Sequence, residues 1–116
     1  MITLYGIPNC DTVKKARKWL EARGVEHRFH DFRKDGLEPK TVAAWVGEIG
    51  LERLVNRRGT TWRKLDGATR DGLDDASAPA LLCENPTLIK RPVIDLGEAR
   101  LVGFDKSVQA ELEAQI

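Results

Sequence analysis

Hydrophobic residues follow two different periods within the first thirty positions. The segment 1–5 is apolar and rich in β-branched side chains, which predicts a strand that ends at Gly6-Ile7-Pro8-Asn9. Between residues 11 and 24 the apolar positions recur at helical spacing, at Val13, Ala16 and Leu20. In residues 25–30, Val25, His27 and Phe29 alternate with the polar residues Glu26, Arg28 and His30, which is the period of a strand. This order predicts a βαβ unit with parallel strands.

The middle of the chain, about residues 37–90, has the pattern of helices. A helix over 39–50 is predicted by a proline in its first turn, a glycine at its end and an apolar stripe at Val42, Trp45, Val46 and Ile49. Residues 51–55 predict one or two further helical turns, and residues 77–85 predict another helix with Ser77 as its cap. This segment is therefore expected to be a helical insert of roughly fifty residues.

The last quarter of the chain predicts a hairpin followed by a helix. Residues 92–96 and 100–104 have strand character, and Gly97-Glu98-Ala99 between them provides the turn. Asp105 is a typical N-cap for a final helix, whose apolar face would consist of Val108, Leu112 and Ile116. Strands near both ends of the chain, with helices between and after them, predict the α/β fold class.

Composition narrows the range of functions. The 116 residues suffice for one domain, and 41% hydrophobic with 32% charged residues indicates a globular chain. Nineteen Lys and Arg residues against eighteen Asp and Glu residues leave a net charge of +1, which argues against nucleic acid or an anionic membrane as the main partner. No apolar segment has the length of a membrane span or the form of a leader, so the expected location is the cytoplasm.

Cysteine provides the candidate chemistry. The chain has two cysteines, Cys10 and Cys83, with neither a CxxC motif nor the spacing of a zinc site, so no metal is expected. Cys10 lies where the first predicted loop meets the first helix, at the carboxyl end of a strand, where ligands of open α/β sheets bind. Helix N-terminal N–H groups stabilise a thiolate there, which favours a reactive cysteine. Cys83 is interpreted as a core or half-buried residue.

Arg91-Pro92 opens the third predicted strand. A proline in the first position of a strand removes no central ladder hydrogen bond, and its peptide bond is a candidate for the cis form. If this strand pairs with the first one, Arg91 faces the Cys10 loop and can bind an oxyanion or stabilise the thiolate. The simpler interpretation is a surface arginine before a strand.

A second basic cluster, with an aromatic residue among its members, lies in the insert at Arg57, Arg58, Trp62, Arg63 and Lys64. Taken alone, it could be a nucleic-acid patch. Four acidic residues follow closely, at Asp66, Asp71, Asp74 and Asp75, so a solvated surface of balanced charge is the preferred interpretation.

Three separated motifs together resemble the ArsC/Spx family, and most closely its small YffB-like branch: residues 6–12 after the first strand, 56–65 in the insert and 88–93 before the hairpin. The resemblance covers nearly the whole chain. It implies a single thioredoxin-like domain over residues 1–116, with the helical insert at about 37–90. It also implies that Pro92 is the characteristic cis-proline facing Cys10.

The resemblance implies a mechanism as well. Arsenate reductases of this family use one nucleophilic cysteine, which Cys10 matches; glutathione resolves the adduct, and glutaredoxin recycles the enzyme. Arg91 matches the arginine before the family's proline, which binds the oxyanion. An insert arginine is also expected, and either Arg58 or Arg57 lies in the right loop. The third anion-binding arginine has no counterpart, because Gly103 stands at that position.

The leading hypothesis is therefore a thiol-dependent, glutathione-linked reductase of a small oxyanion or a disulfide. Cys10 is its nucleophile, Arg58, Arg91 and Pro92 form the substrate site, and no bound cofactor is expected. The first alternative is a regulator similar to Spx that binds RNA polymerase, although Val13 occupies the position where Spx proteins often have the second cysteine of a CxxC switch. A true arsenate reductase is the second alternative.

Overall fold

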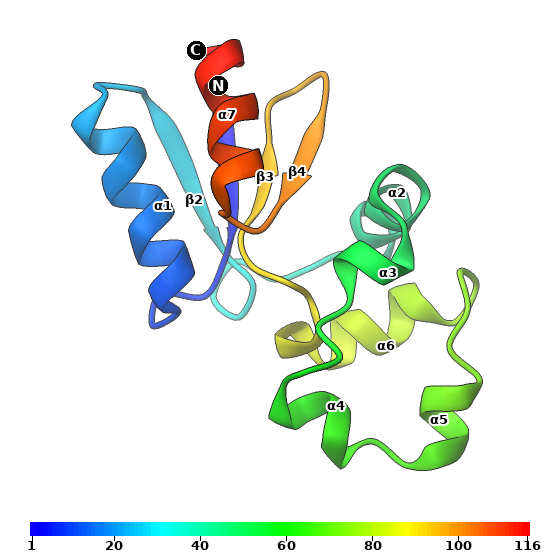
Figure 1. The fold of residues 1–116 in the computed structure, drawn as a ribbon. Coiled ribbons are helices and arrows are strands. Elements are labelled where there is room, and N and C mark those ends of the chain that lie inside the picture. Colours follow the sequence, from blue (N-terminus) through cyan, green and yellow to red (C-terminus); the bar gives the residue numbers. More distant parts are fainter. The chain divides into compact units, whose positions relative to one another are not determined.

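The two ends of the chain share one β-sheet in the computed structural model, which describes all residues from 1 to 116 (Figure 1). The strands are β1 (Ile2–Gly6), β2 (His27–Asp31), β3 (Val93–Asp95) and β4 (Arg100–Val102), in the order β2-β1-β3-β4. β1 pairs parallel with β2 and antiparallel with β3, and β3 pairs antiparallel with β4. The predicted βαβ unit and hairpin are both confirmed, as is the α/β fold class.

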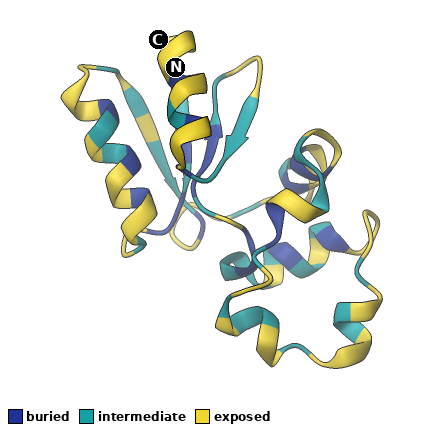
Figure 2. Cartoon of the chain, viewed as in Figure 1, coloured by how far each residue is buried: buried dark blue, intermediate teal, exposed yellow.

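Two helices, α1 (Asp11–Ala22) and α7 (Lys106–Gln115), pack on the same face of this sheet. We call these helices and strands, residues 1–35 and 91–116, the sheet unit. Each helix is buried on one side and exposed on the other (Figure 2). The core between the helices and the sheet consists of Leu4, Ala16, Leu20, Ile94, Phe104, Val108 and Leu112. Burial of these apolar side chains drives the packing.

The connection between α1 and β2 explains why the strand begins later than predicted. Gly24 has a φ of +66°, its N–H donates to the carbonyl of Glu21, and the N–H of Val25 donates to the carbonyl of Leu20. This pattern is a Schellman motif, which satisfies carbonyl groups at the end of the helix. Val25 therefore belongs to the helix terminus, and β2 begins at His27.

In the last helix, α7, the predicted N-cap is confirmed, but only part of the predicted apolar face is buried. The Asp105 carboxylate accepts a hydrogen bond from the Val108 N–H at 2.9 Å, as an N-cap does. Val108 and Leu112 are buried, whereas Ile116 is 47% exposed. Because an α-helix has 3.6 residues per turn, two steps of four residues rotate Ile116 about 80° away from Val108. The prediction that Ile116 packs on the core is wrong.

Residues 36–90 form a second unit, which we call the helical unit. Its α-helices are α2 (Pro39–Ile49), α3 (Leu51–Leu54), α4 (Thr60–Lys64), α5 (Gly67–Asp71) and α6 (Ala78–Glu84), followed by a 3-10 turn at Pro86–Leu88. α2 packs against α6. The prediction of a mostly helical insert is confirmed, although the sequence analysis did not predict the short helices α4 and α5. That the whole chain behaves as a single domain stays a prediction.

The beginning of α6 differs from its predicted form. Ser77 precedes the helix but makes no side-chain cap to it. Instead, the Asp74 carboxylate accepts from the Ser77 N–H at 2.8 Å, and the Ser77 hydroxyl accepts from the Asp74 N–H at 3.1 Å. This reciprocal pair organises the turn before α6. None of the helices combines the length and the apolar character that a membrane span needs.

Candidate functional site

Cys10 is the N-cap residue of α1, at the position the sequence predicted. Its N–H donates to the carbonyl of Ile7 at 3.3 Å, and its own carbonyl accepts from the Lys14 N–H at 3.0 Å. The residue has an extended backbone conformation and makes no side-chain cap bond to the helix. The thiol thus lies at the positive end of the α1 dipole, half-buried, just beyond the carboxyl end of β1.

The helix N-terminus and Arg91 determine the acidity of this thiol. Burial raises the pKa of Cys10, but the backbone N–H of Val13, the Arg91 guanidinium with its charge and the Thr12 N–H together lower it further than burial raises it. The pKa therefore lies below that of an ordinary cysteine, and the thiolate is favoured. The two N–H groups belong to the first turn of α1, so their part in the site depends on the helix starting at Asp11.

Arg91 and Pro92 reach this thiol from the strand that neighbours β1. The Arg91-Pro92 peptide bond is cis, as predicted, and Pro92 is buried immediately before β3. β3 runs antiparallel to β1, so its first residues lie beside the last residues of β1, with Tyr5 opposite Val93. The structure therefore brings Cys10, Arg91 and Pro92 together at one end of the sheet.

Gly103 supports this junction through its backbone. Its N–H donates to the carbonyl of Pro92 at 2.9 Å, and its φ is +82°. A side chain at such a φ is strained, although no heavy atom lies within 4 Å of the position its Cβ would occupy. The backbone thus accounts for a glycine at the position where an arginine is expected in arsenate reductases.

Gly6, the last residue of β1, is a part of the site that the sequence analysis missed. A Cβ atom at Gly6 would lie 2.7 Å from Cγ2 of Val13, closer than real Cβ contacts. Both residues are buried. The missing side chain lets the first turn of α1 approach β1, and the Val13 N–H of that same turn lowers the pKa of Cys10. The sequence signal that could have identified Gly6 is its position between the end of a predicted strand and the loop that contains a cysteine.

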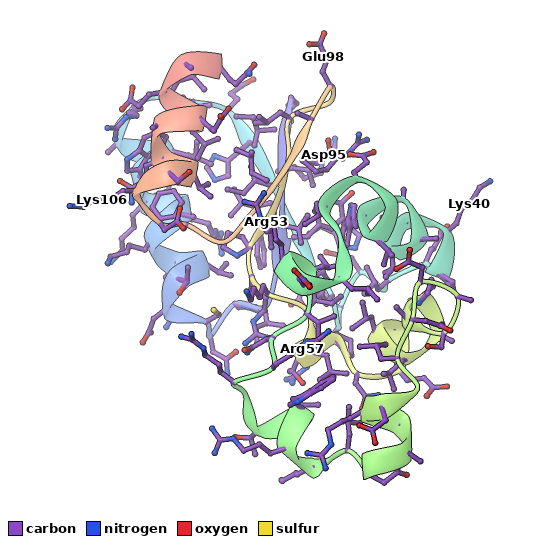
Figure 3. All side chains as sticks on the ribbon, turned by 45° about the vertical axis from the view of Figure 1, so that its right-hand side comes forward. Lys40, Arg53, Arg57, Asp95, Glu98 and Lys106 are labelled. Atoms are coloured by element: carbon purple, nitrogen blue, oxygen red, sulfur yellow. The ribbon has the colours of Figure 1, made fainter.

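The predicted insert arginines lie in the helical unit. Arg57 and Arg58 come from the segment between α3 and α4, where Figure 3 labels Arg57. The Arg58 N–H donates to the Asn56 side-chain oxygen at 3.1 Å, and the Arg57 guanidinium lies 5.2 Å from the centre of the Trp62 ring. That Arg58 binds the same anion as Arg91 stays a prediction.

Cys83 differs from Cys10 in its electrostatic surroundings. It is half-buried on α6, as predicted, and burial raises its pKa. No hydrogen bond or positive charge contributes to offset that effect. Its thiol is consequently the weaker nucleophile of the two at neutral pH.

Comparison with known proteins finds similarity to one protein family over nearly the whole chain. The profile described as the ArsC family matches residues 5–112. An uncharacterized protein of Haemophilus influenzae is 50% identical over 111 residues, which cover 95% of this chain and 97% of that protein. The global transcriptional regulator Spx of Streptococcus agalactiae is 31% identical over 108 residues, or 91% of this chain and 78% of the regulator.

Two solved structures share the fold over almost the full length. The protein YFFB matches with a TM-score of 0.90 and 44% identity, covering 96% of this chain and 97% of its own. An arsenate reductase (ArsC) related protein from Brucella melitensis matches with a TM-score of 0.76 and 43% identity, covering 99% and 95% of the two chains. These similarities confirm the thioredoxin-like α/β fold that the sequence motifs implied.

Alkylation rates measured against pH test the acidity of the two thiols. We expect Cys10 to titrate below the free-thiol pKa of about 8.5 and Cys83 above it, so that Cys10 is modified first at pH 7. Arg91→Ala removes a hydrogen bond and a positive charge, so it should raise the pKa of Cys10 and slow its alkylation at pH 7. An apparent pKa of Cys10 at or above about 8.5 in the unmodified protein would contradict this assignment.

The Gly6–Val13 contact predicts a double-mutant rescue. Gly6→Ala should push the first turn of α1 away from β1, weaken the effect of the Val13 N–H on the sulfur and raise the pKa of Cys10. It should also destabilise the fold by about 1–3 kcal/mol, as overpacking does. Adding Val13→Ala makes room for the new methyl group and should return the pKa toward its original value.

Gly47→Ala is the matched control for that experiment, because nothing lies within 4 Å of its Cβ position in α2. It should leave the titration of Cys10 unchanged. If Gly6→Ala also leaves the titration unchanged, the contact with Val13 does not position the N–H group.

Proposed function

The chain belongs to the ArsC family, and from this premise we propose that it is a thiol-dependent reductase with Cys10 as its nucleophile and glutathione as its co-substrate. One observation supports the proposal above all others. The Cys10 thiol lies at the N-terminus of α1, and the N–H groups of the first turn together with Arg91 lower its pKa, which favours its thiolate form. A thiolate is the form of cysteine that attacks disulfides and electrophilic oxyanions.

With a disulfide substrate, the reaction proceeds through two thiol–disulfide exchanges. The Cys10 thiolate attacks one sulfur of the substrate, a mixed disulfide forms, and the other sulfur leaves as a thiolate that takes up a proton. A glutathione thiolate then attacks the sulfur of the bound substrate half, and Cys10 leaves as the thiolate. When that half is itself glutathione, the product is oxidised glutathione; the one glutathione thiol that was added is oxidised, and the other half of the substrate disulfide has been released as the reduced thiol.

The resolving thiol is external in this proposal. Val13 occupies the position of the second cysteine in a CxxC motif and is fully buried. Cys83 has a pKa raised by burial, which leaves little of its thiolate at neutral pH. Glutathione supplies the reducing equivalents that the chain does not provide, and glutaredoxin recycles the enzyme.

Arg91 has two roles in the proposed mechanism. Before the reaction its positive charge stabilises the Cys10 thiolate, and it also attracts an anionic substrate to that sulfur. Pro92, held in place by the Gly103 N–H, forms the neighbouring backbone wall of the site. Arg58 is proposed as the second cation for the anionic part of the substrate.

The similarity to Spx supports a second candidate function, that of a transcriptional regulator which binds RNA polymerase. A regulator of this kind would not depend on a CxxC switch, because Val13 replaces the second cysteine. The chemistry of Cys10 distinguishes the two candidates, since the reductase requires this sulfur and a constitutive regulator does not.

Incubation with oxidised glutathione, followed by intact-mass and peptide mass spectrometry, tests the reductase proposal. We expect one glutathione adduct at Cys10, which reduced glutathione removes, and none at Cys83 under the same conditions. Cys10→Ser should abolish both the adduct and the turnover of a glutathione mixed disulfide, while Cys83→Ser, the matched control, should preserve them. An adduct on Cys83 alone would refute the role of Cys10.

The regulator hypothesis predicts a different result for Cys10→Ser. Cys10→Ser should keep its binding to purified RNA polymerase in a pull-down assay if the chain is a regulator that needs no thiol chemistry. Binding to the polymerase without any adduct at Cys10 would favour the regulator over the reductase.

Arsenate is expected to be a poor substrate, since Gly103 provides no third cation. One charge-assisted hydrogen bond contributes about 1.5–3 kcal/mol, so its absence should weaken oxyanion binding by about one to two powers of ten. Gly103→Arg should raise kcat/KM for arsenate relative to Gly103→Asn, a control that also has a side chain at a φ of +82° but no positive charge. Efficient turnover of arsenate by the unmodified protein would instead identify a true arsenate reductase.

A further inference from the structure

The solvent-facing side of α1 carries three lysines close to the Cys10 loop. Lys14, Lys15 and Lys18 are separated by one, three or four residues, so their side chains are neighbours on one side of the helix. All three are exposed, whereas the other side of α1 packs on the core (Figure 2). We call this surface the lysine face. It makes α1 the carrier of a local positive charge in a chain whose net charge is only +1.

The arrangement of these charges is unfavourable for the helix itself. The dipole of an α-helix places partial positive charge at its N-terminus, so cations are disfavoured there and favoured at the C-terminus. The three lysines nevertheless lie in the first two turns of α1, and its last turn has no basic residue. Lys14 and Lys18, four residues apart, also repel each other. A charge pattern that opposes local stability is typical of a functional surface.

Contacts within the protein do not explain the lysine face. Arg17, the remaining cation of α1, is half-buried, and its guanidinium lies 4.4 Å from the centre of the Phe29 ring. The three lysines, by contrast, make no ion pair and no side-chain hydrogen bond. None of them is among the groups that lower the pKa of Cys10. Their charges are therefore available to a partner molecule.

The length of the lysine face indicates the size of that partner. An α-helix rises 1.5 Å per residue, so Lys14 and Lys18 lie about 6 and 12 Å along α1 from Cys10. A small oxyanion at the Cys10 sulfur can meet one of these charges but not all three. An extended peptide spans about 3.3 Å per residue, so carboxylates two and four residues from its cysteine would lie at matching distances.

We propose that the lysine face docks an acidic protein segment that carries the disulfide to be reduced. The preferred substrate of Cys10 is then a protein disulfide flanked by Asp or Glu residues. This proposal rests on the reductase function and adds the class of its substrate. Opposite charges on two surfaces accelerate their encounter and fix their orientation, which brings the substrate sulfur to the thiolate.

Three peptides of equal length test the proposal. Each contains one cysteine as a mixed disulfide with glutathione, and the residues two and four positions away on both sides are all Glu, all Gln or all Lys. Release of the peptide thiol in the presence of glutathione is followed by chromatography. At low ionic strength we expect kcat/KM for the Glu peptide to exceed that for the Gln peptide by about tenfold, and the Lys peptide to be the poorest substrate. About 0.5 M salt should reduce the preference to about twofold, because it screens exposed charges.

Substitutions in the lysine face locate the effect. Lys14→Gln and Lys18→Gln should each lower kcat/KM for the Glu peptide by about two- to fivefold, through KM and not kcat, and should affect the Gln peptide less. Glutamine and lysine have similar helix propensities, so α1 is preserved. The double change Lys14→Glu with Lys18→Glu should reverse the order and favour the Lys peptide.

Lys40→Gln is the matched control. It removes the same charge from an exposed residue in the first turn of α2, which Figure 3 labels, and should leave kcat/KM for all three peptides within about twofold.

The outcomes separate the two proposals. Equal kcat/KM for the Glu and Gln peptides at low salt, or a preference that survives both Lys→Gln changes, overturns the docking surface and leaves the reductase intact. Failure to release thiol from any of the peptides overturns the reductase and the docking surface with it. Tighter binding of a duplex DNA oligonucleotide than of the Glu peptide, lost in the double Glu variant, would instead make the lysine face a nucleic-acid surface.

Discussion

The antiparallel pairing of β1 with β3 is the interaction on which the candidate active site depends. Thr3, Leu4 and Tyr5 pair with residues about ninety positions later in the chain, across the whole helical unit. The antiparallel direction places the start of β3 beside the end of β1. Arg91 and Cys10 consequently meet, and the guanidinium lowers the pKa of the thiol. The same pairing opposes Leu4 to Ile94, both fully buried in the core under α1 and α7. Formation of the core and assembly of the site are therefore one event.

Backbone N–H groups and one arginine make the two cysteines different. Both are half-buried cysteines, and burial raises the pKa of each. Cys10 precedes the first turn of a twelve-residue helix, and N–H groups of that turn, which have no partner within the helix, lower the pKa of its thiol together with Arg91. Cys83 lies inside α6, where N–H groups donate to carbonyls of the preceding turn and are not available to a thiol. Position relative to a helix end thus separates a candidate nucleophile from an unreactive residue of the same type.

Features encoded by local sequence could be predicted, and features formed by distant residues could not. The hydrophobic period of α1, the cap at Asp105 and the turn at Gly97 are each determined within a few residues, and all three occur as expected. The Gly6–Val13 contact depends on how closely a helix approaches a strand, and the helical unit contains a bridge between the distant residues 55 and 89. The predicted cap at Ser77 is wrong for a local reason, because the Ser77 hydroxyl accepts from the Asp74 N–H and makes no cap bond to α6.

The glycine at position 103 connects the specificity of the site to its backbone. An arginine there would add a cation, but it would also place a Cβ on a residue whose φ is +82° and whose N–H supports the carbonyl of Pro92. Relaxing φ to a value that suits an arginine would move that N–H and, with it, the backbone next to Arg91. Adding a cation at position 103 is therefore coupled to a change in the position of Arg91. For this reason a single added charge at position 103 is not sufficient to reproduce a three-arginine site, which requires adjustment of the segment from Pro92 to Gly103 as a whole.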